Sequence, residues 1–137
     1  MAIDEAALVG PAGFATQVRQ LPGMTVMELS GELDLSTAGA LREALLMLEL
    51  DGGLGLEIDL RGLSFLGSTG IGVIIAACKR VRASGGTFSV SCDHNLARRV
   101  IEVAGLVDFL ELHDGEDSHP NQRGNEMPPG RALDTPS

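Results

Sequence analysis

The pattern of hydrophobic and polar positions changes several times along the chain, and each change predicts a new element. Phe14 to Val18 alternates between apolar and polar residues, as a half-exposed strand does. Pro22-Gly23 supplies a turn, after which Met24 to Leu29 predicts an antiparallel partner strand. Three further strands are expected at Leu56 to Leu60, Thr87 to Ser91 and Phe109 to Leu112.

Three segments between these strands have a helical period. Ser36 or Thr37 is placed to cap a helix whose apolar residues recur at i, i+3, i+4 and i+7, and Asp51-Gly52-Gly53 ends it. A longer helix from about Thr69 to Ala83 is apolar nearly all round in its first half, which predicts a central, buried position. A third helix is expected from about Asn95 to Ala104. It carries Leu96, Val100 and Val103 on one side and Arg98, Arg99 and Glu102 on another.

The order of these elements predicts an α/β fold. About five strands alternate with helices after an antiparallel first pair, and parallel neighbours need helical crossovers, so a mixed, mostly parallel sheet with helices packed on it follows. Residues 14–113 hold nearly all the large apolar side chains and are expected to form one domain. We expect residues 1–13 to be a flexible segment, and residues 114–137, with four prolines, to be disordered.

Charge and composition exclude several classes of protein. The net charge of −9 disfavours binding to nucleic acid or to an anionic membrane surface, because both need clustered Lys and Arg. No apolar run reaches the roughly 18 residues that a membrane-spanning helix needs, and no signal peptide is visible. Cys78 and Cys92 are too few for a disulfide scaffold. We therefore expect a cytoplasmic protein that neither binds nucleic acid nor inserts into a membrane.

Candidate catalytic and metal-binding residues are sparse. Ser68 follows Gly67, but Leu66-Gly67-Ser68-Thr69-Gly70 lacks the first glycine of a nucleophile elbow, and nothing in the sequence links Ser68 to His94. The histidines lack helical i, i+4 partners, and the two cysteines are 14 positions apart, so they are expected to be loop histidines and packed thiols. We expect no catalytic residues, no metal and no cofactor.

The segment from Gly67 to Gly72 leaves two chemical possibilities open. It opens a helix, where backbone amides can bind phosphate, but its spacing matches no nucleotide-binding fingerprint. Gly70 and Gly72 are better explained if they let the buried helix approach the sheet closely. Ser68 and Thr69 present hydroxyls at the helix start, where a phosphoryl group is tolerated and adds about −1.5 to −2 charges. A phosphorylation switch is therefore a physically reasonable hypothesis, although such hydroxyls are also common helix caps.

Several segments together resemble the STAS domain, which is named for sulfate transporters and anti-sigma factor antagonists. The similarity covers about Thr16 to Leu112, and a free-standing copy is most similar to bacterial anti-sigma factor antagonists. The segments that carry it are Leu29-Ser30-Gly31-Glu32-Leu33-Asp34, Ser36 to Leu48, Leu63 to Ile74, Gly85-Gly86, Arg98-Arg99-Val100 and Ala104-Gly105-Leu106.

The resemblance implies regulation of transcription by partner switching, without catalysis by this chain. In this family the unphosphorylated domain binds an anti-sigma factor with serine kinase activity, which frees a sigma factor. Phosphorylation at the start of the second helix ends that complex, and a metal-dependent serine phosphatase restores it. The implied acceptor is Ser68, with Thr69 as the alternative. The implied partner surface consists of Asp34, Ser36, Gly67, Ser68, Thr69, Gly70 and Ile71.

One position departs from the family motif, Asp-Ser-[Ser/Thr]-Gly-[Leu/Ile]. Gly67 stands where the aspartate is usual. Two hypotheses follow: the kinase accepts Gly67 and modifies Ser68, or the chain binds its partner constitutively. Two other functions remain as alternatives. One is a cytoplasmic STAS subunit of a lipid-transport ABC complex, and the other is a sensor of a small ligand or nucleotide at the Gly67 to Gly72 loop.

Overall fold

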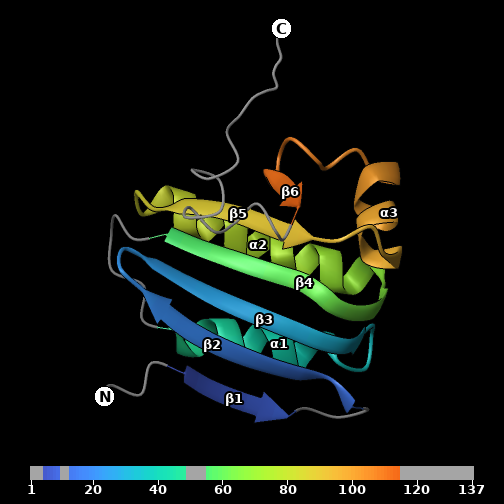
Figure 1. Ribbon diagram of the computed structural model, residues 1–137, viewed down its shortest axis with the longest axis horizontal. Helices are drawn as coiled ribbons and strands as arrows, with labels where there is room; N and C mark the ends of the chain where they lie inside the picture. Colours follow the sequence, from blue (N-terminus) through green and yellow to red (C-terminus); the bar gives the residue numbers. More distant parts are fainter. Residues whose placement is uncertain (1–4, 10–12, 49–54, 115–137) are drawn as a thin grey trace, which may run out of the picture.

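The computed structural model describes residues 5–9, 13–48 and 55–114. They form one six-stranded sheet whose spatial order follows the chain order, β1 to β6 (Figure 1). The strands are β1 (Glu5–Val9), β2 (Ala15–Leu21), β3 (Met24–Leu33), β4 (Gly55–Leu66), β5 (Thr87–Cys92) and β6 (Leu112–Asp114). The helices are α1 (Ala38–Met47), α2 (Ser68–Ala83) and α3 (Leu96–Val103).

The sheet is mixed, as the order of elements predicts. β1, β2 and β3 pair antiparallel, and β3 to β6 pair parallel. Helices α1 and α2 lie side by side behind the sheet in Figure 1, and α3 stands at the end where the parallel strands finish. One row of apolar residues crosses the sheet in register: Val18, Met27, Ile58, Val90 and Leu112.

The core lies between the sheet and the two long helices. Residues at alternate positions of β4 and β5 are fully buried there, and Leu41, Ile74 and Val81 meet them from the helices. Ile74 is therefore central, as the apolar first half of α2 predicts. The opposite face of α2 is exposed at Gly72, Ala76, Lys79 and Arg80, so this helix is half-buried rather than surrounded. Among the described residues, no helix is long and apolar enough to cross a membrane.

The two ends of the sheet differ from the prediction. Residues Glu5–Val9 form β1, which pairs with β2, in the segment expected to have no regular structure. The last strand is Leu112–Asp114 rather than Phe109 to Leu112, because the chain turns through that apolar run with Leu110 buried. The expected helix stop at residues 51–53 and the expected disordered segment from residue 115 lie outside the described residues.

Strand β4 is longer than its apolar run indicates. It continues past Leu60, where the predicted strand ends, to Leu66, and pairs with β3 through register shifts. Leu63 and Leu66 are buried on this extension. Ser68 consequently lies two residues beyond the last residue of a central strand, on a rigid support.

Helix α3 buries a different side from the one that its strongest apolar pattern indicates. Ala97 and Ile101 are buried, whereas Leu96 and Val103 are exposed and Val100 is half-buried. The side chain of Asn95 fixes this orientation. Its Oδ1 accepts a hydrogen bond from the Arg98 N–H (3.0 Å), and its Nδ2 donates to the Leu60 carbonyl of β4 (3.2 Å).

Candidate functional site

The residues singled out by the sequence meet where β3 and β4 end. Leu33 and Leu66 are register partners at the last positions of these parallel strands. The N–H of Gly67 donates a hydrogen bond to the Leu33 carbonyl at 2.8 Å. The loop that begins at Asp34 and leads into α1 therefore lies against the start of α2.

A dense set of hydrogen bonds holds the start of α1. The Asp34 carboxylate oxygen Oδ1 accepts bonds from the Ser36 hydroxyl (2.8 Å), the Ser36 N–H (2.9 Å) and the Thr37 N–H (3.2 Å). The fully buried Thr37 hydroxyl donates to the Glu32 carbonyl (2.8 Å) and accepts from the Asp34 N–H (2.9 Å). Thr37 occupies the N-cap position, but its side chain makes no capping bond. Asp34 performs much of the capping expected of Ser36 or Thr37.

These donors also set the ionisation of Asp34. The hydrogen bond from the Ser36 hydroxyl, with smaller contributions from the Ser36 and Thr37 amides, lowers the pKa of the Asp34 carboxyl below its ordinary value of 3.8. Asp34 therefore presents a fixed negative charge beside the start of α2 at neutral pH.

The start of α2, by contrast, is bare. Gly67 occupies the N-cap position without a side chain to accept a bond, and the first turn contains no acidic residue. Ser68 and Thr69 are both exposed, and neither hydroxyl has a hydrogen-bond partner within the described part of the chain. Two free hydroxyls thus stand among the unpaired amides of a helix start, at its positive end.

The three glycines around Ser68 differ in whether the structure requires a residue without a side chain. A methyl group added at Gly70 would lie 2.5 Å from Cγ of Leu33, a side chain with no exposed surface, so Gly70 permits the close approach of α2. Gly72 faces open space, so the expectation of a close approach is correct for Gly70 and wrong for Gly72. Gly67 has φ −100° and ψ 172°, which any residue adopts, and an added Cβ would lie 3.3 Å from the Phe65 ring.

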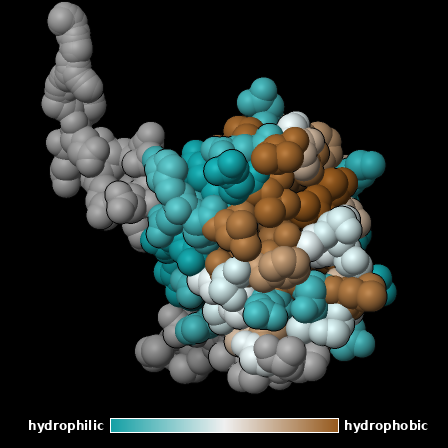
Figure 2. Space-filling model, turned by 90° about the vertical axis from the view of Figure 1, so that its right-hand side faces the viewer, coloured by the Kyte–Doolittle hydropathy of each residue, from teal (hydrophilic) through white to brown (hydrophobic). Residues whose placement is uncertain are grey.

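Two apolar side chains that sequence reasoning missed flank the site. Leu35 is 80% exposed in the loop after β3, and Phe65 is 42% exposed near the end of β4. Figure 2 views this end of the molecule and shows apolar residues gathered across it, beside a hydrophilic area on the sheet side. The available signal was a large apolar residue directly beside Asp34 in a loop that the chain otherwise fills with polar residues.

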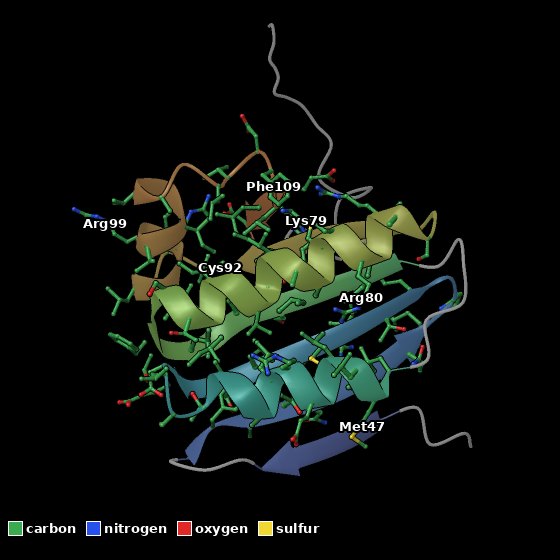
Figure 3. All side chains as sticks on the ribbon, turned by 180° about the vertical axis from the view of Figure 1, so that it is seen from behind. Met47, Lys79, Arg80, Cys92, Arg99 and Phe109 are labelled. Carbon is green, nitrogen blue, oxygen red and sulfur yellow. The ribbon has the colours of Figure 1, made fainter. Side chains whose placement is uncertain are left out.

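The structure places the other candidate residues away from any shared site. Cys78 and Cys92 are free and buried, as expected of packed thiols. Burial raises the pKa of the Cys92 thiol to about 11, and its Sγ donates to Asn95 Oδ1 at 3.0 Å (labelled Cys92 in Figure 3). His94 is exposed, and His119 lies outside the described residues. Among the described residues, no three His, Cys, Asp or Glu side chains are grouped as metal ligands.

Comparisons with known proteins agree on one family. The family model described as STAS domain matches residues 15–119. The anti-sigma-F factor antagonist RsfB of Mycobacterium tuberculosis is 34% identical over 108 residues, covering 76% of this chain and 88% of the relative. The anti-sigma-B factor antagonist of Bacillus subtilis is 33% identical over 98 residues, covering 69% of this chain and 86% of that protein. The crystal structure of an anti-sigma factor antagonist from Mycobacterium paratuberculosis superposes with a TM-score of 0.70 at 32% identity, covering 81% and 94% of the two chains.

Proposed function

The chain belongs to the STAS domain family, and on that premise we propose that it is an anti-sigma factor antagonist. It binds an anti-sigma factor through the surface formed by Asp34, Ser36, Gly67, Ser68, Thr69 and Ile71, and so releases a sigma factor. Gly70, which was expected to belong to this surface, is buried against Leu33 and supports the surface from below. It acts in the bacterial cytoplasm, where sigma factors meet RNA polymerase, and it catalyses no reaction itself.

The observation that carries this proposal is the exposed Ser68 hydroxyl, which has no hydrogen-bond partner among the described residues, on the surface that also exposes Leu35 and Phe65. Exposed apolar groups favour association, because burying them in an interface removes apolar surface from water. A hydroxyl is tolerated in such an interface, whereas a phosphate is not. The same spot therefore supports binding in one chemical state and opposes it in the other.

We further propose that Ser68 is the switch. The kinase activity of the anti-sigma factor transfers the γ-phosphoryl group of ATP to the Ser68 oxygen, which loses its proton, and ADP leaves. Free amides at the start of α2 accommodate the phosphate, so the domain keeps its fold. The added charge of about −1.5 to −2, close to the Asp34 carboxylate, opposes desolvation of the interface. A metal-dependent serine phosphatase hydrolyses the phosphoester and restores binding.

Gly67 fits this proposal without a carboxylate at that position. Its backbone conformation does not require glycine, and the nearest carboxylate on the neighbouring loop, Asp34, is already held by Ser36 and Thr37. We propose that kinase recognition rests on the exposed Ser68 hydroxyl and the Asp34 loop. Thr69, also exposed, is the alternative acceptor.

The test is calorimetric titration of purified anti-sigma factors into wild type, Ser68→Ala and Ser68→Glu. We expect Ser68→Ala to bind as tightly as wild type and Ser68→Glu to bind at least about tenfold more weakly. Met47→Glu, at an exposed position of α1 outside this surface, is the control for an added negative charge and should bind as wild type does. Equal affinity of Ser68→Glu and wild type contradicts the switch but not the antagonist function, whereas no binding by wild type contradicts both.

A second measurement identifies the acceptor. Incubation with the anti-sigma factor and ATP, followed by peptide mass spectrometry, should find one phosphoryl group on Ser68. The Ser68→Ala variant should not be modified. Modification of Thr69 instead moves the switch by one residue, and absence of modification in wild type supports constitutive binding.

A further inference from the structure

Helix α3 exposes two large apolar side chains on its outward side, Leu96 and Val103. Leu96 is 49% exposed and Val103 is 78% exposed, while the buried contacts of this helix come from Ala97 and Ile101. Leu96, Arg99 and Val103 follow one another at i, i+3 and i+7, with the half-buried Val100 beside them. We call Leu96, Arg99 and Val103 the outer stripe; it covers about two turns, or roughly 10 Å of helix.

The charge on the outer stripe is a single unpaired cation. Arg98 is not part of the stripe; its guanidinium is shared between the Glu102 carboxylate at 3.1 Å and the Asp114 carboxylate at 2.7 Å. Arg99 is exposed and has no ion-pair partner among the described residues. Figure 3 shows Arg99 projecting outward from α3, away from the sheet and from α2. An apolar contact flanked by this guanidinium suits a partner that offers a carboxylate.

The outer stripe lies on the same end of the molecule as Ser68. Asn95, directly before Leu96, donates to the Leu60 carbonyl (3.2 Å) and lies at 3.5 Å from the Leu63 carbonyl of β4. Strand β4 then continues through the exposed Phe65 to its end at Leu66. Figure 1 shows α3 at the end where β3 and β4 finish and α2 begins, and Figure 2 shows apolar residues spread over this end. A protein that covers Ser68 is therefore placed to reach α3 as well.

We propose that the outer stripe is a second contact site for the anti-sigma factor, and that it binds an amphipathic helix carrying an acidic residue opposite Arg99. This assignment rests on the proposed function. Binding at the Ser68 surface depends on whether Ser68 is phosphorylated, whereas the outer stripe determines which anti-sigma factor binds. A second copy of this chain suits the stripe less well. A two-fold contact would bring the Arg99 side chains of both copies into one interface, between chains of net charge −9.

The experiment compares two exposed apolar pairs in full-length protein. Leu96→Ser with Val103→Ser removes the outer stripe, and Leu46→Ser with Met47→Ser is the matched control. Leu46 and Met47 are 61% and 70% exposed on α1, and Met47 lies at the opposite end of the molecule in Figure 3. The probe is a purified anti-sigma factor that binds wild type, measured by calorimetry. We expect the α3 pair to weaken binding by about tenfold or more and the α1 pair to leave it unchanged.

Charge reversal provides a variant with no apolar change. Arg99→Glu should weaken binding several-fold, and the loss should shrink as salt is raised. Thermal unfolding by circular dichroism must show all variants folded as wild type. Unchanged affinity in the folded α3 pair overturns the stripe assignment and leaves the proposed function standing. Failure of wild type to bind any anti-sigma factor overturns both. A wild-type dimer in analytical ultracentrifugation that the α3 pair abolishes assigns the stripe to a second copy instead.

Discussion

Two helices start side by side in this domain, and they are built in opposite ways. The start of α1 is tied down by Asp34 and the buried Thr37, whose side chains satisfy backbone groups across the loop. The start of α2 has a glycine at the N-cap and two exposed hydroxyls without partners in the described chain. Both follow adjacent ends of β3 and β4, so their surroundings do not explain the difference.

The two helix starts are suited to different roles: the loop before α1 keeps one conformation, whereas the first turn of α2 can accept an added group. The side chains of Asp34, Ser36 and Thr37 in the loop into α1 are all hydrogen-bonded, so the loop offers a partner a fixed shape and a fixed charge at Asp34. Within the part of the chain that the structure describes, the amides and hydroxyls of the first turn of α2 have no partners, so this turn accepts a new group without breaking bonds seen there. Unequal capping of the two neighbouring helices is therefore consistent with the proposed phosphorylation of Ser68.

The largest effect is expected where the two starts touch. Gly70→Ala places a methyl group 2.5 Å from Cγ of the fully buried Leu33, and such overpacking should lower the free energy of unfolding by about 2–3 kcal/mol. Gly72→Ala, two residues on in open space, should instead raise it by up to about 1 kcal/mol through helix propensity. Urea unfolding measures both. Equal changes in the free energy of unfolding in the two variants would mean that α2 can shift away from β3 to accommodate the methyl group at position 70.

The buried hydroxyl of the α1 start comes next. Thr37→Val keeps the side-chain shape but removes the partner of the Glu32 carbonyl and the Asp34 N–H, at an expected cost of about 1–2 kcal/mol. Ser36→Ala, on the exposed side of the same loop, should cost about 0.5 kcal/mol or less. Denaturant midpoints of the two variants give the comparison. A larger loss in Ser36→Ala means that the exposed part of the network holds the loop.

A capping side chain at the start of α2 is expected to stabilise the protein. Gly67→Asp supplies a cap oxygen and a negative charge at the positive end of the helix, which should raise the free energy of unfolding by about 0.5 kcal/mol. Gly67→Ala fills the same space without an acceptor and should give no gain. Thermal melts at low salt compare the two. A loss in both variants means that the Phe65 ring, 3.3 Å from the new Cβ, does not move aside.

The smallest expected effect is a pH dependence at Asp34. Its hydrogen bonds from Ser36 and Thr37 lower the pKa of this carboxyl in the folded chain below the ordinary value of 3.8. The stabilisation is therefore complete above the unfolded pKa of about 4 and is lost as the pH falls through the lower folded value. The urea midpoint of wild type should fall more between about pH 6 and pH 3 than that of Asp34→Asn. If the urea midpoints of wild type and Asp34→Asn change in parallel with pH, the ionisation of Asp34 does not contribute to the pH dependence of stability.

The sequence predicts the order of elements far better than it predicts which surfaces stay open. The segments Asp34 to Ser36 and Gly67 to Ile71, which the resemblance implies as a partner surface, lie close together because β3 and β4 end in register. That they bind a partner stays a prediction. The eight-residue α3 was less tractable, because it has two apolar sides and its period alone does not say which one Asn95 turns inward. The edge strand β1 is five residues long and carries too little pattern to mark a strand.

The contact of Gly70 with Leu33 bears on how fast such a switch works. Leu33 is the last residue of β3, directly before Asp34, and its buried side chain packs tightly against Gly70 in the first turn of α2. Any other arrangement of the Asp34 loop or of the start of α2 would disrupt this packing and raise the free energy. A partner that meets a preformed surface waits for no rearrangement, and its association rate should fall in the docking-limited range of about 10⁵–10⁷ M⁻¹ s⁻¹. Under the proposed phosphorylation of Ser68, the rate of the response is then set by the enzymes that add and remove the phosphate, and not by rearrangement of this chain.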